Sequence, residues 1–561
     1  HPSGAPHPTP RRYDIVYGDV MLNFNYNINR FDIAATVGWT GRYENMNNIR
    51  VSTNGGLVTE NWFDLNASRY TPSSTLQRME LLKTGYMGTL SLGWDNYLFL
   101  ELTGRQERSS TLKDQSFFYP SANLSFLFTQ AFHMPSWWNY GKLRLSYGIV
   151  GNAPETYTAN IVYEQGSDNG FTWNTIPSSW GNADIRPEKK YEYEIGLESK
   201  FLNNRLGIDV SYYNNRVKDQ ILSTPQPSTS GVKNVLMNVG EVANHGWDIS
   251  ISATPILTRD FRWDLTANYG VYKNKVVKLA DGVPYLEILN SGGSGIKIQA
   301  VEGQPMGDIY AQVPQVNENG EYLVSDKGLY LNQTELQKVG NINPAGVGGL
   351  FNSFSYKNVF LDFSIDFRIG GDVINEMNQY ATAVGLTPES LKYRDTEHGG
   401  LSYYYPGDNN SSGIPVQVDP STGVGPNGEI IYHDGIILPG VVASTGERNT
   451  RIIPAGYYYN TTYNWGTEAE QLTYRHSVFD NSYVKLRELT IGYQFPEKMI
   501  SKLGLGRLSV SVFGRNLFYF YKALKNYDAE SSVGTSWANQ ATVGSSTTAT
   551  RSFGVSLRAS F

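Results

Sequence analysis

The chain has 561 residues, no cysteine and a formal net charge of −6 at pH 7. Its length would ordinarily suggest several globular domains, to which a single large all-β architecture is the known exception. The charge balance and the lack of a basic run argue against nucleic-acid binding. No run of eighteen apolar residues is present. This excludes a transmembrane helix but not barrel strands, in which lipid-facing and lumen-facing residues alternate.

Apolar and polar residues alternate with a period of two along much of the sequence. In residues 361–369 (LDFSIDFRI), apolar side chains hold every odd position and Asp, Ser or Arg holds every even one. The C-terminal stretch 553–561 repeats the pattern. Many such segments reach the length of about ten residues that crosses a bilayer at a tilt. We therefore predict an all-β fold, a transmembrane antiparallel β-barrel.

The alternation predicts about fifteen strands, with boundaries that can shift by a few residues. They are expected at 20–29, 31–46, 84–95, 97–109, 117–129, 141–150, 191–202, 205–221, 239–257, 261–279, 347–357, 360–373, 482–495, 507–518 and 551–561.

The predicted connections alternate in length, as they do in outer-membrane barrels. Tight turns are expected at 29–30, 95–96, 203–204 and 357–358, and a short connection with a helical turn at 496–506. Long polar segments lie between them, at 47–83, 151–190, 280–346, 374–481 and 519–550. The long segments are interpreted as extracellular loops.

This alternation has a topological consequence. Short turns mark the periplasmic rim, where the last strand would end at Phe561. Counting back an odd number of strands puts the start of the first strand at the extracellular rim. Residues 1–19 are therefore expected to be the remnant of an extracellular loop. Residues 20–561 are expected to form the C-terminal portion of a barrel whose first strands are not in this chain.

Ten segments carry a family resemblance. They are Gly85–Ser110, Phe117–Phe126, Lys142–Asn152, Arg186–Asn215, Asn238–Trp247, Gly303–Tyr310, Gly340–Gly349, Tyr483–Pro496, Gly514–Phe518 (GRNLF) and the terminal strand that ends in Phe561. Each is a common strand-and-turn string, but in this number and order they resemble the barrel of SusC/RagA-type TonB-dependent outer-membrane transporters of Bacteroidetes-like bacteria.

The resemblance implies a barrel of about 22 strands with a plugged lumen, so that about seven strands and the plug domain would lie upstream. It also implies the partners of such a transporter: outer-membrane lipid, a SusD-type surface lipoprotein as lid, and TonB acting through the absent N-terminal part. The implied function is active import of an oligosaccharide or oligopeptide across the cell outer membrane. No nucleic-acid partner is expected.

The candidate substrate-binding residues are aromatic and lie in the long segments. Exposed aromatic rings beside Asn, Asp and Ser can stack on sugar rings or hold peptide side chains, although such rings also pack loops against one another or against a lid protein. The candidates are Trp173, Trp180, Tyr403, Tyr404, Tyr405, Trp465 and Trp537. By the resemblance, the terminal Phe561 is a signal for barrel insertion; the alternative is an ordinary edge strand that ends in Phe.

No catalytic, cofactor-binding or metal site is predicted, and the protein is not expected to be an enzyme. The seven histidines are scattered, and no HExxH, GxSxG or P-loop motif is present. Two alternatives to the transporter stay open. One is a passive porin or a surface-display barrel. The other is an outer-membrane hydrolase with a site carried by a loop.

Overall fold

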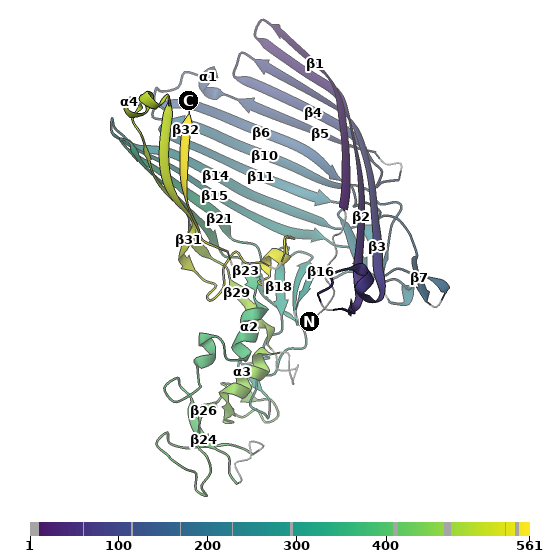
Figure 1. Cartoon of the computed structure of the whole chain (residues 1–561), viewed down its shortest axis with the longest axis vertical. Helices are drawn as coiled ribbons and strands as arrows, with labels where there is room; N and C mark the ends of the chain where they lie inside the picture. The colour runs from purple at the N-terminus through teal and green to yellow at the C-terminus, as the bar shows by residue number, and fades with distance from the viewer. Residues whose placement is uncertain are drawn as a thin grey trace. The chain divides into compact units, whose positions relative to one another are not determined.

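The structure is a computed structural model that describes residues 11–59, 61–113, 116–168, 170–226, 228–291, 295–407, 413–464, 473–532, 534–544 and 549–560. Its main feature is a sheet of 15 strands that follow one another in chain order (Figure 1). The pairings between neighbouring strands are antiparallel. The predicted all-β fold and the number of strands are confirmed.

All fifteen predicted strands are present. Their bounds are β1 (Arg11–Ile28), β2 (Phe31–Leu57), β3 (Ser68–Trp94), β4 (Leu98–Ser109), β5 (Ser116–Phe126), β6 (Trp138–Asn152), β10 (Glu188–Phe201), β11 (Leu206–Lys218), β14 (Glu241–Leu257), β15 (Phe261–Lys278), β21 (Gly346–Tyr356), β22 (Val359–Ile369), β30 (Tyr483–Gln494), β31 (Arg507–Lys522) and β32 (Ser552–Ser560).

The chain divides into two compact units. The first unit comprises residues 1–247 with 274–283, and the second comprises residues 248–273 with 284–561.

The first three strands are longer than the alternation predicts. β1 begins at Arg11, so residues 11–19 lie in a strand and not in a loop remnant. Most of the predicted loop 47–83 is also a paired hairpin, because β2 and β3 stay in register far beyond the predicted ends. The extension alternates only briefly: Ile49 and Val51 share one face, and polar residues predominate beyond them, as where the Ser52 and Ser73 hydroxyls lie 2.7 Å apart. A short helix η1 (Leu65–Ala67) closes the connection.

Short turns and long connections alternate along the sheet, as predicted. Two-residue turns join β1 to β2 and β21 to β22, and each opens on a residue with a left-handed backbone: Asn29 (φ 52°) and Lys357 (φ 52°). Asn is among the residues that tolerate this region best. Between β30 and β31 lie the helices α4 (Glu497–Ile500) and η6 (Ser501–Leu503), which confirms the predicted helical turn.

The two faces of β32 differ in polarity. In β32, Phe553, Val555 and Leu557 alternate with small or polar residues and are 68–73% exposed. Leaving so much apolar surface open in water is rare in a folded protein. Rings also follow one another near the short turns of the first unit, from Trp94 to Tyr97 (centroids 5.3 Å apart) and on to Phe126 (6.1 Å). The row of rings continues into the next helix, α1 (Phe128–Ala131).

The long connections of the first unit contain short strands of their own. They are β7 (Glu164–Asp168), β8 (Phe171–Thr175), β9 (Ser179–Trp180), β12 (Ile221–Pro225) and β13 (Asn234–Asn238), with the helix η2 (Ser228–Ser230). β7 and β8 form a hairpin, while β9, β12 and β13 form a small sheet. Ala159 and Ile185, from the two ends of the connection between β6 and β10, pack with Leu112 and Phe117 in one apolar cluster. This cluster anchors the connection to the strands.

The long connections of the second unit form a folded body, here called the loop body (residues 284–345, 370–482 and 523–551). Its elements are β16 (Tyr285–Ser291), β17 (Ile296–Val301), β18 (Asp308–Ala311), β19 (Leu323–Val324), β20 (Gln337–Asn341), β23 (Asp372–Ile374), α2 (Glu376–Ala383), η4 (Pro388–Leu391), β24 (Leu401–Tyr404), β25 (Val416–Gln417), β26 (Tyr432–Ile436), β27 (Val441–Val442), β28 (Ile453–Pro454), α3 (Ala455–Tyr463), η5 (Tyr474–Ser477), β29 (Val478–Asp480) and η7 (Asn539–Ala541).

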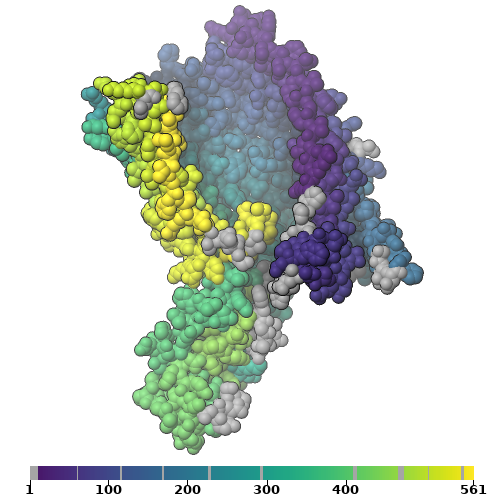
Figure 2. All heavy atoms as spheres, in the orientation of Figure 1, coloured from purple at the N-terminus to yellow at the C-terminus, as the bar shows by residue number. Residues whose placement is uncertain are grey.

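One apolar core joins the three segments of the loop body. Ile298 and Ile309 come from the first segment, Val478 from the second and Ala541 from the third, and all four are buried. Figure 2 shows the green residues of the second segment as a compact mass and not as separate loops. In the part of the chain that the structure describes, no helix combines the length and the apolarity needed to cross a membrane.

Candidate functional site

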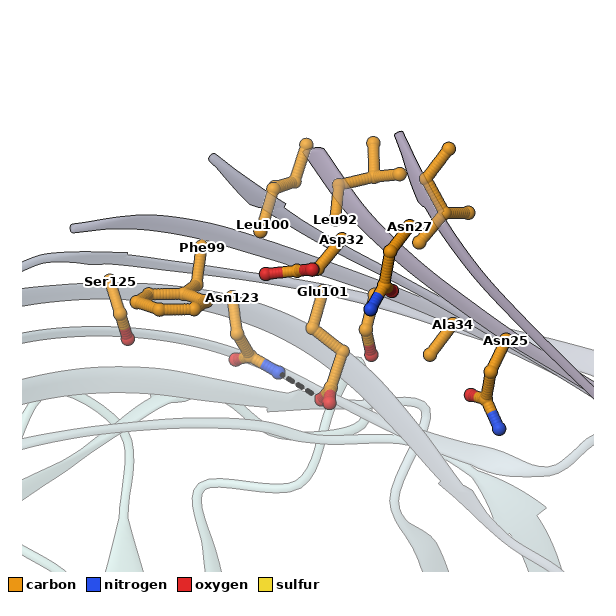
Figure 3. Close-up of a pocket in the computed structure, with 13 residues that line it drawn as sticks. Asn25, Asn27, Asp32, Ala34, Leu92, Phe99, Leu100, Glu101, Asn123 and Ser125 are labelled. Carbon is orange, nitrogen blue, oxygen red and sulfur yellow. Dashed lines mark hydrogen bonds between the residues drawn. The ribbon is translucent and has the colours of Figure 1, made fainter. Parts of the chain in front are cut away.

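A hollow of about 660 Å³ lies on one face of the first unit's sheet, next to the short turns (Figure 3). Polar side chains from five neighbouring strands face it: Asn25, Asp32, Ser91, Glu101, Asn123 and Ser125. Leu92 and Leu100 point to the opposite side of the sheet. We call the side with the hollow the polar face.

Strand register explains why these residues meet. Residues that pair across antiparallel strands share a face. Ser91 of β3 pairs with Glu101 of β4, which pairs with Asn123 of β5. A parallel row runs from Asp32 through Gly93 to Phe99. The alternation within each strand and the register between strands therefore produce a polar surface together.

The hollow presents acidic and amide groups. The Asn123 amide donates a hydrogen bond to the Glu101 carboxylate (Nδ2–Oε1 3.3 Å), and a second hollow of about 220 Å³ shares Asn123. Further along the same face, Arg105 pairs with Glu107 (2.7 Å) and Arg144 with Asp209 (2.6 Å). Carboxylates and amides on one wall can bind the hydrogen-bonding groups of a peptide backbone or of a hydroxylated ligand.

Two of the predicted ligand residues are core residues of the loop body. Tyr403 is 1% exposed, and its hydroxyl donates to the Asp434 carboxylate at 3.1 Å. Its ring packs against Tyr405, which is also buried, and against Tyr432. Burial, reinforced by Asp434, raises the pKa of the Tyr403 hydroxyl. Tyr403 and Tyr405 therefore fill the alternative role of packing the loop.

The other predicted aromatics keep some open surface. Tyr404 and Trp180 are half-buried, and Trp180 meets the ring of Tyr163 edge-on (5.9 Å). Trp537 is partly exposed beside Gly307. Trp173, on β8, is the most exposed of the set at 46%. The structure does not bring these residues into one site, and Trp465 and Phe561 lie outside the described residues.

A tyrosine cluster joins the helices of the loop body. Tyr458, Tyr459 and Tyr463 of α3 contact one another. Burial raises the pKa of Tyr459 to about 12. The ring of His476 lies flat on Tyr463, with centroids 4.3 Å apart. Burial, helped by the neighbouring charge of Arg475, lowers the pKa of His476 to about 4, so this imidazole is neutral near pH 7.

A charge network that the sequence did not reveal ties the third loop segment to the strands. Lys485 is 1% exposed, and its ammonium lies 2.6 Å from Glu530. Arg487 reaches the other Glu530 oxygen at 2.6 Å and Asp366 at 2.6 Å. Burial alone would raise the pKa of Glu530, but the hydrogen bonds from Arg487 and Lys485 outweigh it and lower the pKa to about 2.

The sequence separations in this network explain why it was missed. Lys485 and Glu530 are 45 residues apart, and no spacing rule links a strand to a distant loop. The sequence indicated more about the residues of the polar face. Glu101 and Asn123 both lie in predicted strands, so the alternation assigns each to the polar side of its own strand. Only the register, which the sequence does not state, places them together.

A serine and a histidine meet in the loop body. The Ser402 hydroxyl lies 2.9 Å from His433 Nδ1. Such a pair would be needed by a serine hydrolase. Ser402 is buried, however, and cannot reach a substrate carbonyl in this arrangement.

Long antiparallel strands with one apolar face, short turns at one end and folded loops at the other define the class of outer-membrane β-barrel proteins. A family model described as "TonB dependent receptor-like, beta-barrel" matches residues 3–301. The chain belongs to this family of TonB-dependent receptor-like β-barrels.

Curated relatives agree with this assignment. TonB-dependent receptor P3 of Formosa agariphila is 24% identical over 80% of this chain and 42% of its own length. TonB-dependent receptor SusC of Bacteroides thetaiotaomicron is 30% identical over 40% of this chain and 24% of its own length. The chain therefore spans less than half the length of these relatives.

A solved structure shows the same fold. The RagAB peptide importer in its open-open state aligns with 99% of this chain and 56% of its own, with a TM-score of 0.70 and 19% identity. The resemblance to the SusC/RagA type that the sequence motifs indicated is confirmed.

Proposed function

We infer that the chain is the C-terminal barrel portion of an outer-membrane transporter that imports an oligosaccharide or oligopeptide with energy delivered by TonB. The observation that carries this proposal is the 15-stranded sheet with alternating short and long connections. Family membership supports it. In this proposal the plug and the first strands come from sequence outside this chain, and the polar face lines the lumen. A SusD-type surface lipoprotein covers the loops.

The folded loop body supports a transporter over a simple pore. Three long connections share one core, and an ion-pair network around the buried Lys485 fastens the third to the strands. A vestibule of defined shape is suited to holding a ligand, whereas a general pore does not require one. We propose that the aromatic residues that contact the substrate include Tyr404, Trp180 and Trp537. We propose that Phe561 is the signal for barrel insertion.

Uptake measurements test the proposal. Cells with and without the protein are given labelled oligosaccharides or oligopeptides, with and without an uncoupler that collapses the proton gradient. We expect uptake that needs both the protein and the gradient. Uptake that needs the protein but persists with the uncoupler would show a passive porin. Binding or adhesion without any uptake would support a display barrel.

A density map of the native particle provides a second, independent test. The complex would be extracted from its own membrane in mild detergent and examined by cryo-microscopy without imposed symmetry. The proposal requires a closed barrel of about 22 strands with a plug. A smaller barrel closed by this chain alone, with an open lumen, would contradict it. Density beneath a lid would distinguish a glycan from a peptide.

A further inference from the structure

The hairpin β7–β8 of the first unit carries an unusually exposed apolar surface. Phe171 is 77% exposed and Trp173 is 46% exposed, and both lie on one face of β8. Ile161, Val162 and Tyr163, just before β7, and Ile176, just after β8, are each about half exposed or more. In Figure 1 the hairpin extends beyond β2 and β3 of the same unit, on the side of the long connections. We call these six residues the hairpin patch.

The hairpin patch is presented by ordered backbone. Trp173 pairs with Gly166 across the hairpin, and its ring lies on that glycine: an added Cβ would come within 2.7 Å of the ring. The connection is also fixed to the strands, because the Tyr157 hydroxyl accepts a hydrogen bond from the Glu80 backbone N–H (3.1 Å). Aromatic rings held in one orientation lose little conformational entropy when a partner binds.

The charge around the hairpin patch restricts what can cover it. Residues 151–185 contain four acidic residues and no Lys, Arg or His. Phosphate-rich lipid headgroups would be repelled by this segment, since like charges disfavour contact. A sugar would use the rings but would gain little from the exposed aliphatic side chains of Ile161, Val162 and Ile176. Aliphatic and aromatic side chains on an acidic segment match a protein surface that combines apolar residues with Lys and Arg.

We propose that the hairpin patch is a docking surface for the surface lipoprotein, and that the lipoprotein contacts it through an apolar site edged by Lys and Arg. This inference rests on the proposed function, which includes such a lipoprotein. It adds the location of a contact on this chain and the chemistry of the partner's side.

Copurification from the organism's own outer membrane tests the proposal. The complex is extracted in mild detergent, and the amount of lipoprotein per barrel chain is measured by quantitative mass spectrometry, which identifies the partner by its lipidated N-terminus. The double variant Phe171→Ser/Trp173→Ser should retain roughly tenfold less lipoprotein, because central aromatic residues dominate the affinity of protein interfaces. Glu164→Lys should lower retention several-fold, and the loss should be salt-dependent.

A matched control separates the patch from general surface apolarity. Met499, on α4 in the short connection between β30 and β31, is 60% exposed, and Met499→Ser should leave lipoprotein retention unchanged. A photoreactive residue placed at Thr175, on the same face of β8 as Phe171 and Trp173, gives a second readout. It should crosslink to a lipoprotein peptide that contains apolar residues next to Lys or Arg. Heat-modifiable mobility on gels verifies that each variant still forms a barrel.

The outcomes distinguish this proposal from the proposed function. If the unaltered protein retains no lipoprotein, the proposal of a lipoprotein lid is wrong, and the proposal of a docking surface is wrong with it. If the hairpin variants retain as much lipoprotein as the unaltered protein, the docking surface is overturned while the transporter stands. Crosslinks from residue 175 to lipid alone, or loss of substrate binding with full lipoprotein retention, would likewise overturn it.

Discussion

The strands and the loop body place their apolar side chains in opposite ways. On β32, Val555 is 72% exposed and faces away from the polar side of the sheet. In the loop body, Ile298 and Ile309 are fully buried in a cluster of other apolar residues. The loop body is built as a water-soluble protein is, by burying apolar surface. The sheet gains little from such burial and depends on backbone hydrogen bonds and on an apolar environment outside it.

This difference predicts which changes each region tolerates. A charge on the outer face of the sheet should be costly only where lipid meets it. A charge or cavity in the loop body should be costly where water is excluded.

The largest effect is expected at the junction of the two regions, from Glu530→Gln. This variant leaves the buried Lys485 without its charged partner, which typically costs about 3–5 kcal/mol. Hydrogen exchange should show that residues 523–532 lose protection first. Glu488→Gln is the control, because Glu488 pairs with Arg515 at an exposed position, where such pairs contribute about 0–1 kcal/mol. Equal effects of the two variants would show that the buried network does not hold the loop.

The outer face of the sheet is tested by Val555→Arg. In a barrel within a bilayer, this charge should cost about 2–4 kcal/mol if residue 555 lies near the midplane. The measurement is denaturant unfolding of the reconstituted protein in phospholipid bilayers. Leu386→Arg, at a position of similar exposure in the loop body, should cost less than about 0.5 kcal/mol. If both changes are harmless, Val555 does not face lipid, and the proposed difference between the outer face of the sheet and the surface of the loop body is wrong.

The loop body, but not the sheet, should respond to mild acid through His476. Its folded pKa of about 4 lies below the unfolded value of 6.5. Above pH 6.5 both states are neutral at this residue and its contribution to stability is complete. Between pH 6.5 and pH 4 the unfolded chain binds a proton that the folded one does not. Stability is therefore lost as the pH falls, by roughly 3 kcal/mol at most.

The acid response has a direct test. Limited proteolysis of the loop body should accelerate between pH 6.5 and pH 4, while the heat-modifiable mobility of the barrel stays constant. His476→Phe, which keeps a ring against Tyr463, should weaken this dependence. If that variant shows the same acid response as the unaltered protein, groups other than His476 set it.

The sequence allowed the strands to be predicted, because the alternation reflects two different environments at every second residue. It failed for the extension of β2 and β3, where polar residues predominate and the alternation is brief. It also failed to separate Tyr403 from Tyr404. Neighbouring tyrosines in a polar loop have no periodicity, and only the pairing of β24 with β26 decides which ring turns inward. The hairpin patch was visible only in part, through Trp173.

The smallest effect concerns the turns. Asn29 and Asn61 both have a left-handed backbone, with φ of 52° and 61°, but Asn29 lies in a two-residue strand turn and Asn61 in a long connection. Replacing either by Ala should cost about 1 kcal/mol in local strain, and replacing it by Gly should cost almost nothing. At Asn29 the strain is coupled to the β1–β2 register, so Asn29→Ala should slow barrel assembly or lower the unfolding midpoint. At Asn61 the same strain can be relieved by rearrangement of the connection, so barrel stability should not change. Matched losses at both positions would mean that the long connection is as tightly coupled to the strands as the short turn.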